Sequence, residues 1–150
     1  MKNLITLVLF LFLLQCGYKV VYNQKNLSKI NVTVGEMKGD ASINNLINSN
    51  LKRYSSSESE KNYIIDVNTS FSKSILSKNA AGKATKLKLD AKMNFNVILN
   101  ETSQNFTFKE SINIDNLSDK YEQNNYENVI KRNFVNTVIE KLIIKINMIK

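Results

Sequence analysis

The amino-acid sequence predicts an α+β fold, in which a four-stranded, mostly antiparallel sheet carries two helices packed on one face. Three long segments in the middle of the chain alternate apolar and polar residues with period two, which is typical of strands with one buried face. A segment before them and a longer one after them repeat apolar residues every three or four positions, as amphipathic helices do. Because each strand keeps one polar face, a single layer of helices buries all the apolar residues.

The first strand and the first helix are expected near the start of the domain. Residues 30–34 alternate apolar and polar side chains and predict a short strand, which Gly35 and Gly39 are expected to end. Asp40 or Ser42 can then cap the N-terminus of a helix. The apolar residues that recur on one face of this helix are Ile43, Leu46, Ile47, Leu51 and Tyr54. A polar break separates the helix from the next apolar segment.

The three long alternating segments predict the other strands. The first covers residues 63–75, and a loop over residues 79–82 separates it from the second. The second, residues 87–99, has the most regular alternation in the chain. A polar turn is expected over residues 100–105. The apolar sides of the first and third segments are Tyr63, Ile65, Val67, Thr69, Phe71 and Ile75, and Phe106, Phe108, Ile112 and Ile114.

The last part of the chain, from Ser118 onwards, predicts one long helix. No glycine or proline interrupts it, and its apolar residues recur at spacings of three and four. The predicted stripe consists of Tyr126, Ile130, Phe134, Val138, Leu142, Ile146 and Ile149, widened by Val129, Val135, Ile139 and Ile143.

The N-terminal residues predict export and lipidation. Lys2 precedes an apolar run of about 11 residues, the length of a signal-peptide core rather than of a bilayer span. The run ends in Leu13-Leu14-Gln15-Cys16, which resembles a bacterial lipobox. Residues 1–15 are therefore expected to be a lipoprotein signal peptide, and Cys16 the site of lipid attachment. An ordinary secretory signal or a retained N-terminal anchor are the alternatives.

The predicted anchor also determines the domain organisation. Residues 16–29 form a lipidated linker, and residues 30–150 form one domain. Gly17 stands where an aspartate would resemble an inner-membrane retention signal, so delivery to the outer membrane is expected. Several acyl chains would hold the protein there essentially permanently.

The composition favours binding over catalysis. The chain has no histidine, and its acidic residues are spread singly, so neither a general base nor a metal site is indicated. We therefore expect no enzymatic activity, no metal and no cofactor. The net charge of +8 suits an anionic partner, and for an exported protein lipid is a better candidate than nucleic acid.

Lysines surround the predicted loop over residues 79–82. If the flanking strands form a hairpin, Lys78, Lys83, Lys86 and Lys88 gather near its tip, where ammonium groups could bind phosphate. The alternative is a solvated strand face on which lysines prevent edge-to-edge pairing.

Three motifs in this order resemble the LptE family of lipopolysaccharide-assembly lipoproteins. Cys16-Gly17-Tyr18 is similar to the family's lipidated start, and Ala81-Gly82-Lys83-Ala84-Thr85-Lys86 to its Gly-x-Ala-Thr-Arg pattern. The stretch from Tyr121 to Tyr126 resembles the tyrosine-rich entry to its final helix. Lys86 stands where arginine is usual. The resemblance covers nearly the whole mature chain.

This resemblance implies a lipoprotein that plugs an LptD-type outer-membrane β-barrel, helps it assemble, and binds lipopolysaccharide for delivery to the outer leaflet. The alternative is a periplasmic lipoprotein that regulates or tethers a cell-wall enzyme. About 13 residues separate Cys16 from the first strand, a reach of at most roughly 40 Å, which favours a partner close to the membrane. A secreted lipid-binding domain without an anchor is a third interpretation.

Overall fold

A computed structural model describes residues 30–55, 59 and 61–149. The predicted signal peptide, Cys16 and the linker over residues 16–29 lie outside these residues. The described chain forms a four-stranded sheet in the order β1-β2-β3-β4, with β1 parallel to β2 and the other neighbours antiparallel. The elements are β1 (Asn31–Gly39), α2 (Ala41–Tyr54), β2 (Asn62–Lys78), β3 (Ala84–Leu99), β4 (Thr102–Asp115) and α3 (Lys120–Asn147).

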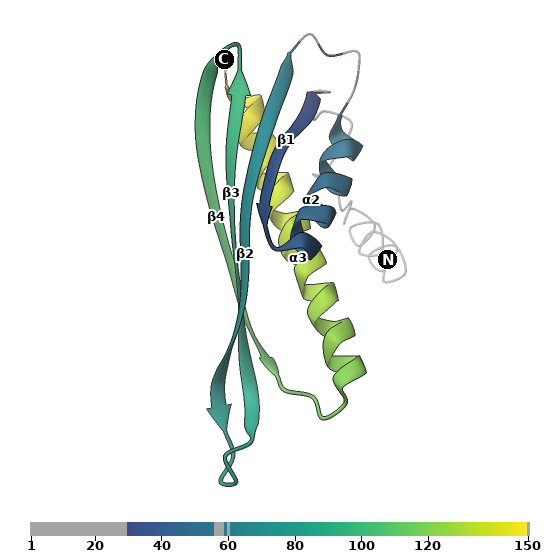
Figure 1. Cartoon of the computed structure of the whole chain (residues 1–150), viewed down its shortest axis with the longest axis vertical. Helices are drawn as coiled ribbons and strands as arrows, with labels where there is room; N and C mark the ends of the chain where they lie inside the picture. The colour runs from purple at the N-terminus through teal and green to yellow at the C-terminus, as the bar shows by residue number, and fades with distance from the viewer. Residues whose placement is uncertain (1–29, 56–58, 60, 150) are drawn as a thin grey trace, which may run out of the picture.

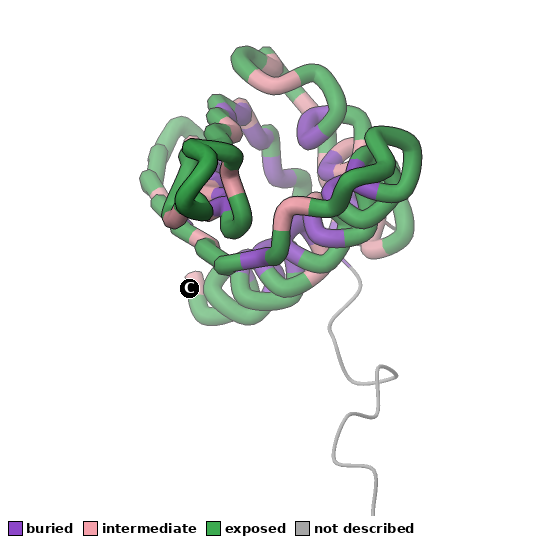
Figure 2. The backbone as a smooth tube through the Cα atoms, turned by 90° about the horizontal axis from the view of Figure 1, so that it is seen from below, coloured by how far each residue is buried: buried purple, intermediate pink, exposed green. Residues whose placement is uncertain are grey.

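Both helices pack on the same face of the sheet (Figure 1), which confirms the predicted α+β fold. Viewed along the long axis, the sheet curves around the helices, and the buried residues lie between the two layers (Figure 2). We call this side of the sheet the helix face and the opposite side the outer face. The helix α2 connects β1 to β2 and lets these two strands run parallel.

The alternation of apolar and polar residues in β2 and β3 places the apolar side chains of both strands in the core. In β3 the odd-numbered residues from Leu87 to Val97 are all buried, while the even-numbered ones face away from the helices. Phe95 packs edge-to-face on Phe108 of β4, with ring centroids 5.9 Å apart. The isoleucines and leucines on the inner faces of the helices that fill the other side of the core are Ile43, Ile47, Leu51, Ile139, Leu142, Ile143 and Ile146.

The strand boundaries near two turns differ from the prediction. The prediction of a polar turn over residues 100–105 was wrong, because only Asn100 and Glu101 connect β3 to β4. Both residues have positive φ, 48° and 67°, as the twist of a two-residue hairpin turn requires. The first strand does not end at Gly35 but continues to Gly39, with a register shift between Val34 and Met37. A bulge of this kind leaves the extra residues of β1 unpaired, and the pairing with β2 continues after it.

The N-terminus of α3 corrects the predicted apolar stripe. Asp119 caps the helix by accepting hydrogen bonds from the backbone N–H groups of Tyr121 and Glu122. From Ile130 to Ile146 the stripe is buried as predicted, and Ile149 is half-buried after the end of α3, but Tyr126 and Val129 are exposed. Gln123 and Glu127 are buried in their place, since both side chains form hydrogen bonds there.

Candidate functional site

The molecule is elongated, and its two ends carry different features (Figure 1). We call one end the base: it contains the start of β1, the start of β2, the turn at residues 100–101 and the last residues of α3. We call the other end the tip: it is the hairpin turn at residues 79–82 between β2 and β3. Because β2 has 17 residues, the tip lies about 55 Å from the base at the usual rise per strand residue.

The tip itself is a tight, locally hydrogen-bonded turn. The side chain of Asn79 accepts hydrogen bonds from the backbone N–H groups of Ala81 and Lys83. Gly82 has a φ of 77°, which favours glycine. Lys78 is the register partner of Ala84, so the structure brings Lys78 and Lys83 to the same turn, and both are exposed.

Lys86 and Lys88 lie farther along β3 and share the outer face of the sheet. Each has a carboxylate nearby. Lys88 Nζ lies 3.0 Å from Asp90 Oδ1, and Lys86 is the register partner of Asp115 on β4. Hydrogen bonds from Lys88 and then from Ser111 hold the pKa of Asp90 below its usual range. The two tip lysines therefore carry more unneutralised charge than the two lysines on the strand.

Lys73, which is close to this group in sequence, points the other way. It lies on the helix face, where its Nζ donates to both carboxylate oxygens of Glu127 at 2.8 and 3.2 Å. Gln123 donates to the same carboxylate and accepts a hydrogen bond from the backbone N–H of Leu117. This cluster connects β2, α3 and the loop before α3, so we assign Lys73 a structural role.

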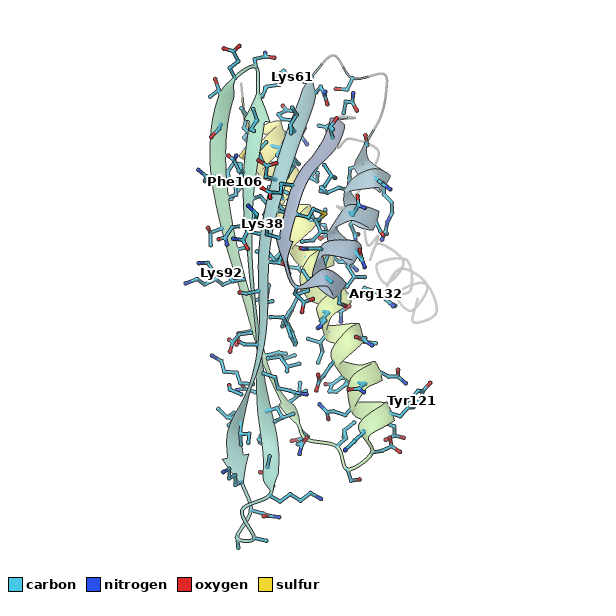
Figure 3. All side chains as sticks on the ribbon, in the orientation of Figure 1. Lys38, Lys61, Lys92, Phe106, Tyr121 and Arg132 are labelled. Carbon is cyan, nitrogen blue, oxygen red and sulfur yellow. The ribbon has the colours of Figure 1, made fainter. Side chains whose placement is uncertain are left out.

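The outer face contains a second pair of lysines that sequence reasoning missed. Lys92 on β3 is the register partner of Lys109 on β4, and both are exposed. Figure 3 shows Lys92 pointing away from the helices. The alternating pattern alone places both residues on the polar side of their strands. Only the register of β4, which begins earlier than predicted, brings them together.

Large apolar residues are exposed on the tip side of the molecule. Ile75 and Leu76 of β2 are 54% and 50% exposed, and Ile112 and Leu117 are partly exposed near the end of β4. Ile75 was predicted to face the core, and it does lie in line with the helix face. Its neighbours in the same row, Leu87 on β3 and Ile114 on β4, are buried, so in this row the exposure is confined to the β2 side of the sheet. The lysines of the tip thus lie beside apolar side chains.

Other kinds of site find no support in the part of the chain that the structure describes. There, no three acidic, cysteine or histidine side chains are placed to hold a metal ion. None of its helices combines the length and apolar character needed to cross a bilayer. A hollow of about 160 Å³ at the base is lined by Val97, Leu99, Asn100, Thr102, Gln104 and Ile149. This volume is below that of a usual ligand pocket.

Comparison with known proteins identifies the fold. The structure resembles rare lipoprotein B from Shewanella oneidensis with a TM-score of 0.56 and 11% sequence identity, covering 77% of this chain and 98% of that one. It resembles a minor lipoprotein from Acinetobacter baumannii with a TM-score of 0.52 and 12% identity, covering 78% and 94% of the two chains. No protein-family model matches the sequence, and no curated protein matches it. The chain therefore shares the fold of these bacterial lipoproteins.

Proposed function

We propose that this protein is an outer-membrane lipoprotein of the LptE type, which binds lipopolysaccharide and plugs and helps assemble an LptD-type β-barrel. The observation that carries the proposal is the fold match over 98% of rare lipoprotein B. The lipobox-like residues before Cys16 and the motifs around Gly82 and Tyr121 support it independently of the fold. In this proposal the protein binds and positions its ligand, and it catalyses no reaction.

The distribution of charge along the molecule suits such a role. A lipid anchor at Cys16 would be connected to the domain at its base, where the described chain begins. Lys78 and Lys83 at the tip lie about 55 Å from that end. In this arrangement the ammonium groups bind lipopolysaccharide phosphates away from the anchoring leaflet. The exposed Ile75 and Leu76 provide apolar surface beside these charges.

The outer face of the sheet suits the inside of a barrel. Asparagine, serine, threonine and lysine predominate there, as in the row formed by Asn68, Asn94 and Thr107. Thr107 donates a hydrogen bond to Asn94, whose amide donates to the backbone carbonyl of Asn68. The interior of an outer-membrane barrel is also polar, so the two surfaces can form hydrogen bonds without burying unpaired groups.

The anchor is tested by replacing Cys16 with serine. Because the sulfur atom is the proposed attachment site, this variant should incorporate no labelled fatty acid and should leave the membrane fraction. Metabolic labelling and fractionation measure both effects. Incorporation equal to that of the unmodified chain would contradict lipidation at Cys16.

The partner is tested by affinity isolation from solubilised outer membranes. A β-barrel protein recovered in equal molar amount with the tagged chain is the expected result. The alternative function, a periplasmic lipoprotein that regulates or tethers a cell-wall enzyme, predicts that a cell-wall enzyme is recovered instead. That result would overturn the barrel role.

Binding of lipopolysaccharide is tested by reversing the charge at the tip. We choose Lys78→Glu combined with Lys83→Glu, because Lys86 and Lys88 lie beside carboxylates and their reversal would also disturb the sheet. The double variant should bind purified lipopolysaccharide at least tenfold more weakly, with an unchanged melting temperature. Lys52→Glu combined with Lys61→Glu is the matched control, because both side chains are exposed and Figure 3 shows Lys61 at the base. An equal loss in the control would show an effect of net charge alone and exclude a site at the tip.

A further inference from the structure

Two lysines face each other directly on the outer face of the sheet. Lys92 and Lys109 are register partners in the β3–β4 ladder, which pairs 14 consecutive residues of each strand without a shift. The Cβ atoms of such partners lie about 5 Å apart, and like charges in this position destabilise a sheet. The repulsion is a cost to the free protein that an anion bound between the two ammonium groups would remove.

Neighbouring lysines on the outer face differ because each has an acidic partner. Lys38 Nζ lies 2.9 Å from a carboxylate oxygen of Glu36, and Lys88 lies 3.0 Å from Asp90. Within the described residues, neither Lys92 nor Lys109 forms a salt bridge.

Asp90, two residues before Lys92, is the nearest carboxylate on the outer face, because Glu110 next to Lys109 points to the helix face and pairs with Lys141. Its Oδ1 lies 3.0 Å from Lys88 Nζ, and the Lys88 side chain is the largest cause of its lowered pKa. Asp90 therefore has a cationic partner of its own, and no salt bridge joins it to Lys92 or Lys109.

The residues around the pair can complete an anion site. Ser70 on β2 is the register partner of Lys92, so a hydroxyl, an ammonium group and a second ammonium group lie in one row across three strands. In the next row Thr107 donates a hydrogen bond to Asn94, so these two side chains interact with each other and not with Lys92 or Lys109. All three side chains of the row are exposed in the chain without a partner, so an anion can approach them there from solvent.

We propose that Lys92, Lys109 and Ser70 form a binding site for a phosphate monoester group, distinct from the lysines of the tip. A phosphate monoester carries a charge between −1.5 and −2 at neutral pH and offers three acceptor oxygens, which matches two ammonium groups and a hydroxyl. The site follows from the register of the sheet and does not depend on the proposed function. Its ligand is either a free phosphate compound or a phosphorylated lipid headgroup.

The site is tested by the thermal stability of the mature chain in sodium phosphate and in sodium chloride of equal ionic strength. Phosphate should raise the melting temperature of the wild-type chain relative to chloride. Lys109→Gln should have a higher melting temperature than wild type in chloride, because the repulsion is gone, and should lose the response to phosphate. A structural lysine would behave in the opposite way, since its replacement would lower stability.

The matched control is Lys38→Gln, which removes the same charge from the same face. The substitution removes the ion pair between Lys38 and Glu36, so the variant should not become more stable than wild type in chloride. The variant should keep the full response to phosphate. The proposal is overturned if wild type shows no response to phosphate, if Lys109→Gln keeps it, or if Lys38→Gln loses it equally. The tip variant Lys78→Glu with Lys83→Glu should keep the response, which separates this site from lipopolysaccharide binding at the tip.

Vesicles identify the source of the phosphate group. Phosphatidic acid exposes a phosphate monoester, whereas phosphatidylglycerol exposes only a diester. If the ligand is a lipid headgroup, wild type should bind phosphatidic acid vesicles several-fold more tightly than phosphatidylglycerol vesicles, and Lys109→Gln should lose this preference. Equal binding to both vesicles, together with the phosphate response in solution, would support a free phosphate compound as the ligand.

Discussion

The base half and the tip half of β2 have the same alternating sequence pattern but different burial. In the base half, Ile65 and Met93 are completely buried beneath α2 and the C-terminal part of α3. In the tip half, Ile75 continues the same side of β2 yet is 54% exposed, although its register partner Leu87 on β3 is buried. The difference arises because α2 has only 14 residues and packs on the base half alone, where it contacts β1 and the first part of β2. An apolar residue on the correct face of a strand is therefore buried only where a helix covers it.

The polar contacts of the two halves follow the same division. Towards the base, Thr69 donates a hydrogen bond to Asn44 of α2 at 2.8 Å, and this pair is buried. In the tip half, a polar contact between sheet and helix is the ion pair of Lys73 and Glu127. The Lys73 side chain is 44% exposed, so solvent screens this pair and it contributes little. The tip half should therefore open more easily than the base half.

The largest expected difference comes from placing the same carboxylate in each half. Phe95→Asp would bury a charge at a position that is 1% exposed, at a cost of several kcal/mol, comparable to the total stability of a domain. Ile75→Asp places the charge in solvent and should change the free energy of unfolding by less than about 1 kcal/mol. Urea denaturation followed by circular dichroism measures both. Equal damage from the two variants would show that β2 is as well covered at Ile75 as β3 is at Phe95.

The two glycines with positive φ offer a second comparison of the halves. In Gly39→Ala the new Cβ would clash with the backbone carbonyl oxygen of Thr69, so the strand would have to move. In Gly82→Ala the new Cβ meets no atom within 4 Å, and only the cost of the positive φ remains. We expect a loss of roughly 2–5 kcal/mol for Gly39→Ala and of about 1–2 kcal/mol for Gly82→Ala. Thermal or urea unfolding checks the order, and a larger loss at Gly82 would contradict it.

The smallest effect is expected for the ion pair of the tip half. Glu127→Gln removes the charge that faces Lys73 and should lower the free energy of unfolding by about 1 kcal/mol or less, because Lys73 is substantially exposed. Hydrogen exchange should become faster at the start of α3 and stay unchanged in the base half. Glu140→Gln, an exposed change in the same helix, is the control and should alter neither property. If exchange accelerated equally in both halves, the halves would unfold as one unit.

The strands and helices were largely predictable because the periodicity of apolar residues reports which face of each element is covered. β2, β3 and the part of α3 from Ile130 onwards follow the prediction closely. The prediction was wrong where polar residues take positions that the pattern does not anticipate. Gln123 and Glu127 are buried because Lys73 and the backbone of Leu117 satisfy them, and both partners are distant in sequence or outside the helix. The start of β4 was missed because its first residues are polar on both faces.

One of the two candidate sites could be predicted from local sequence spacing, and the other could not. The lysines of the tip were predictable, because Lys78 and Lys83 flank a four-residue turn and a hairpin necessarily brings them together. The pair of Lys92 and Lys109 was not, because 16 positions separate the two residues and a shift of register by one residue would turn one of them to the other face.

By itself, the sequence determined the order of the elements, the apolar face of each strand and the lysines that a short turn holds together, since all of these depend on local spacing. The tertiary structure decided which part of β2 is covered, which polar residues are buried and which lysines face each other. These depend on helix length and strand register, and therefore on contacts between segments that are far apart in the chain.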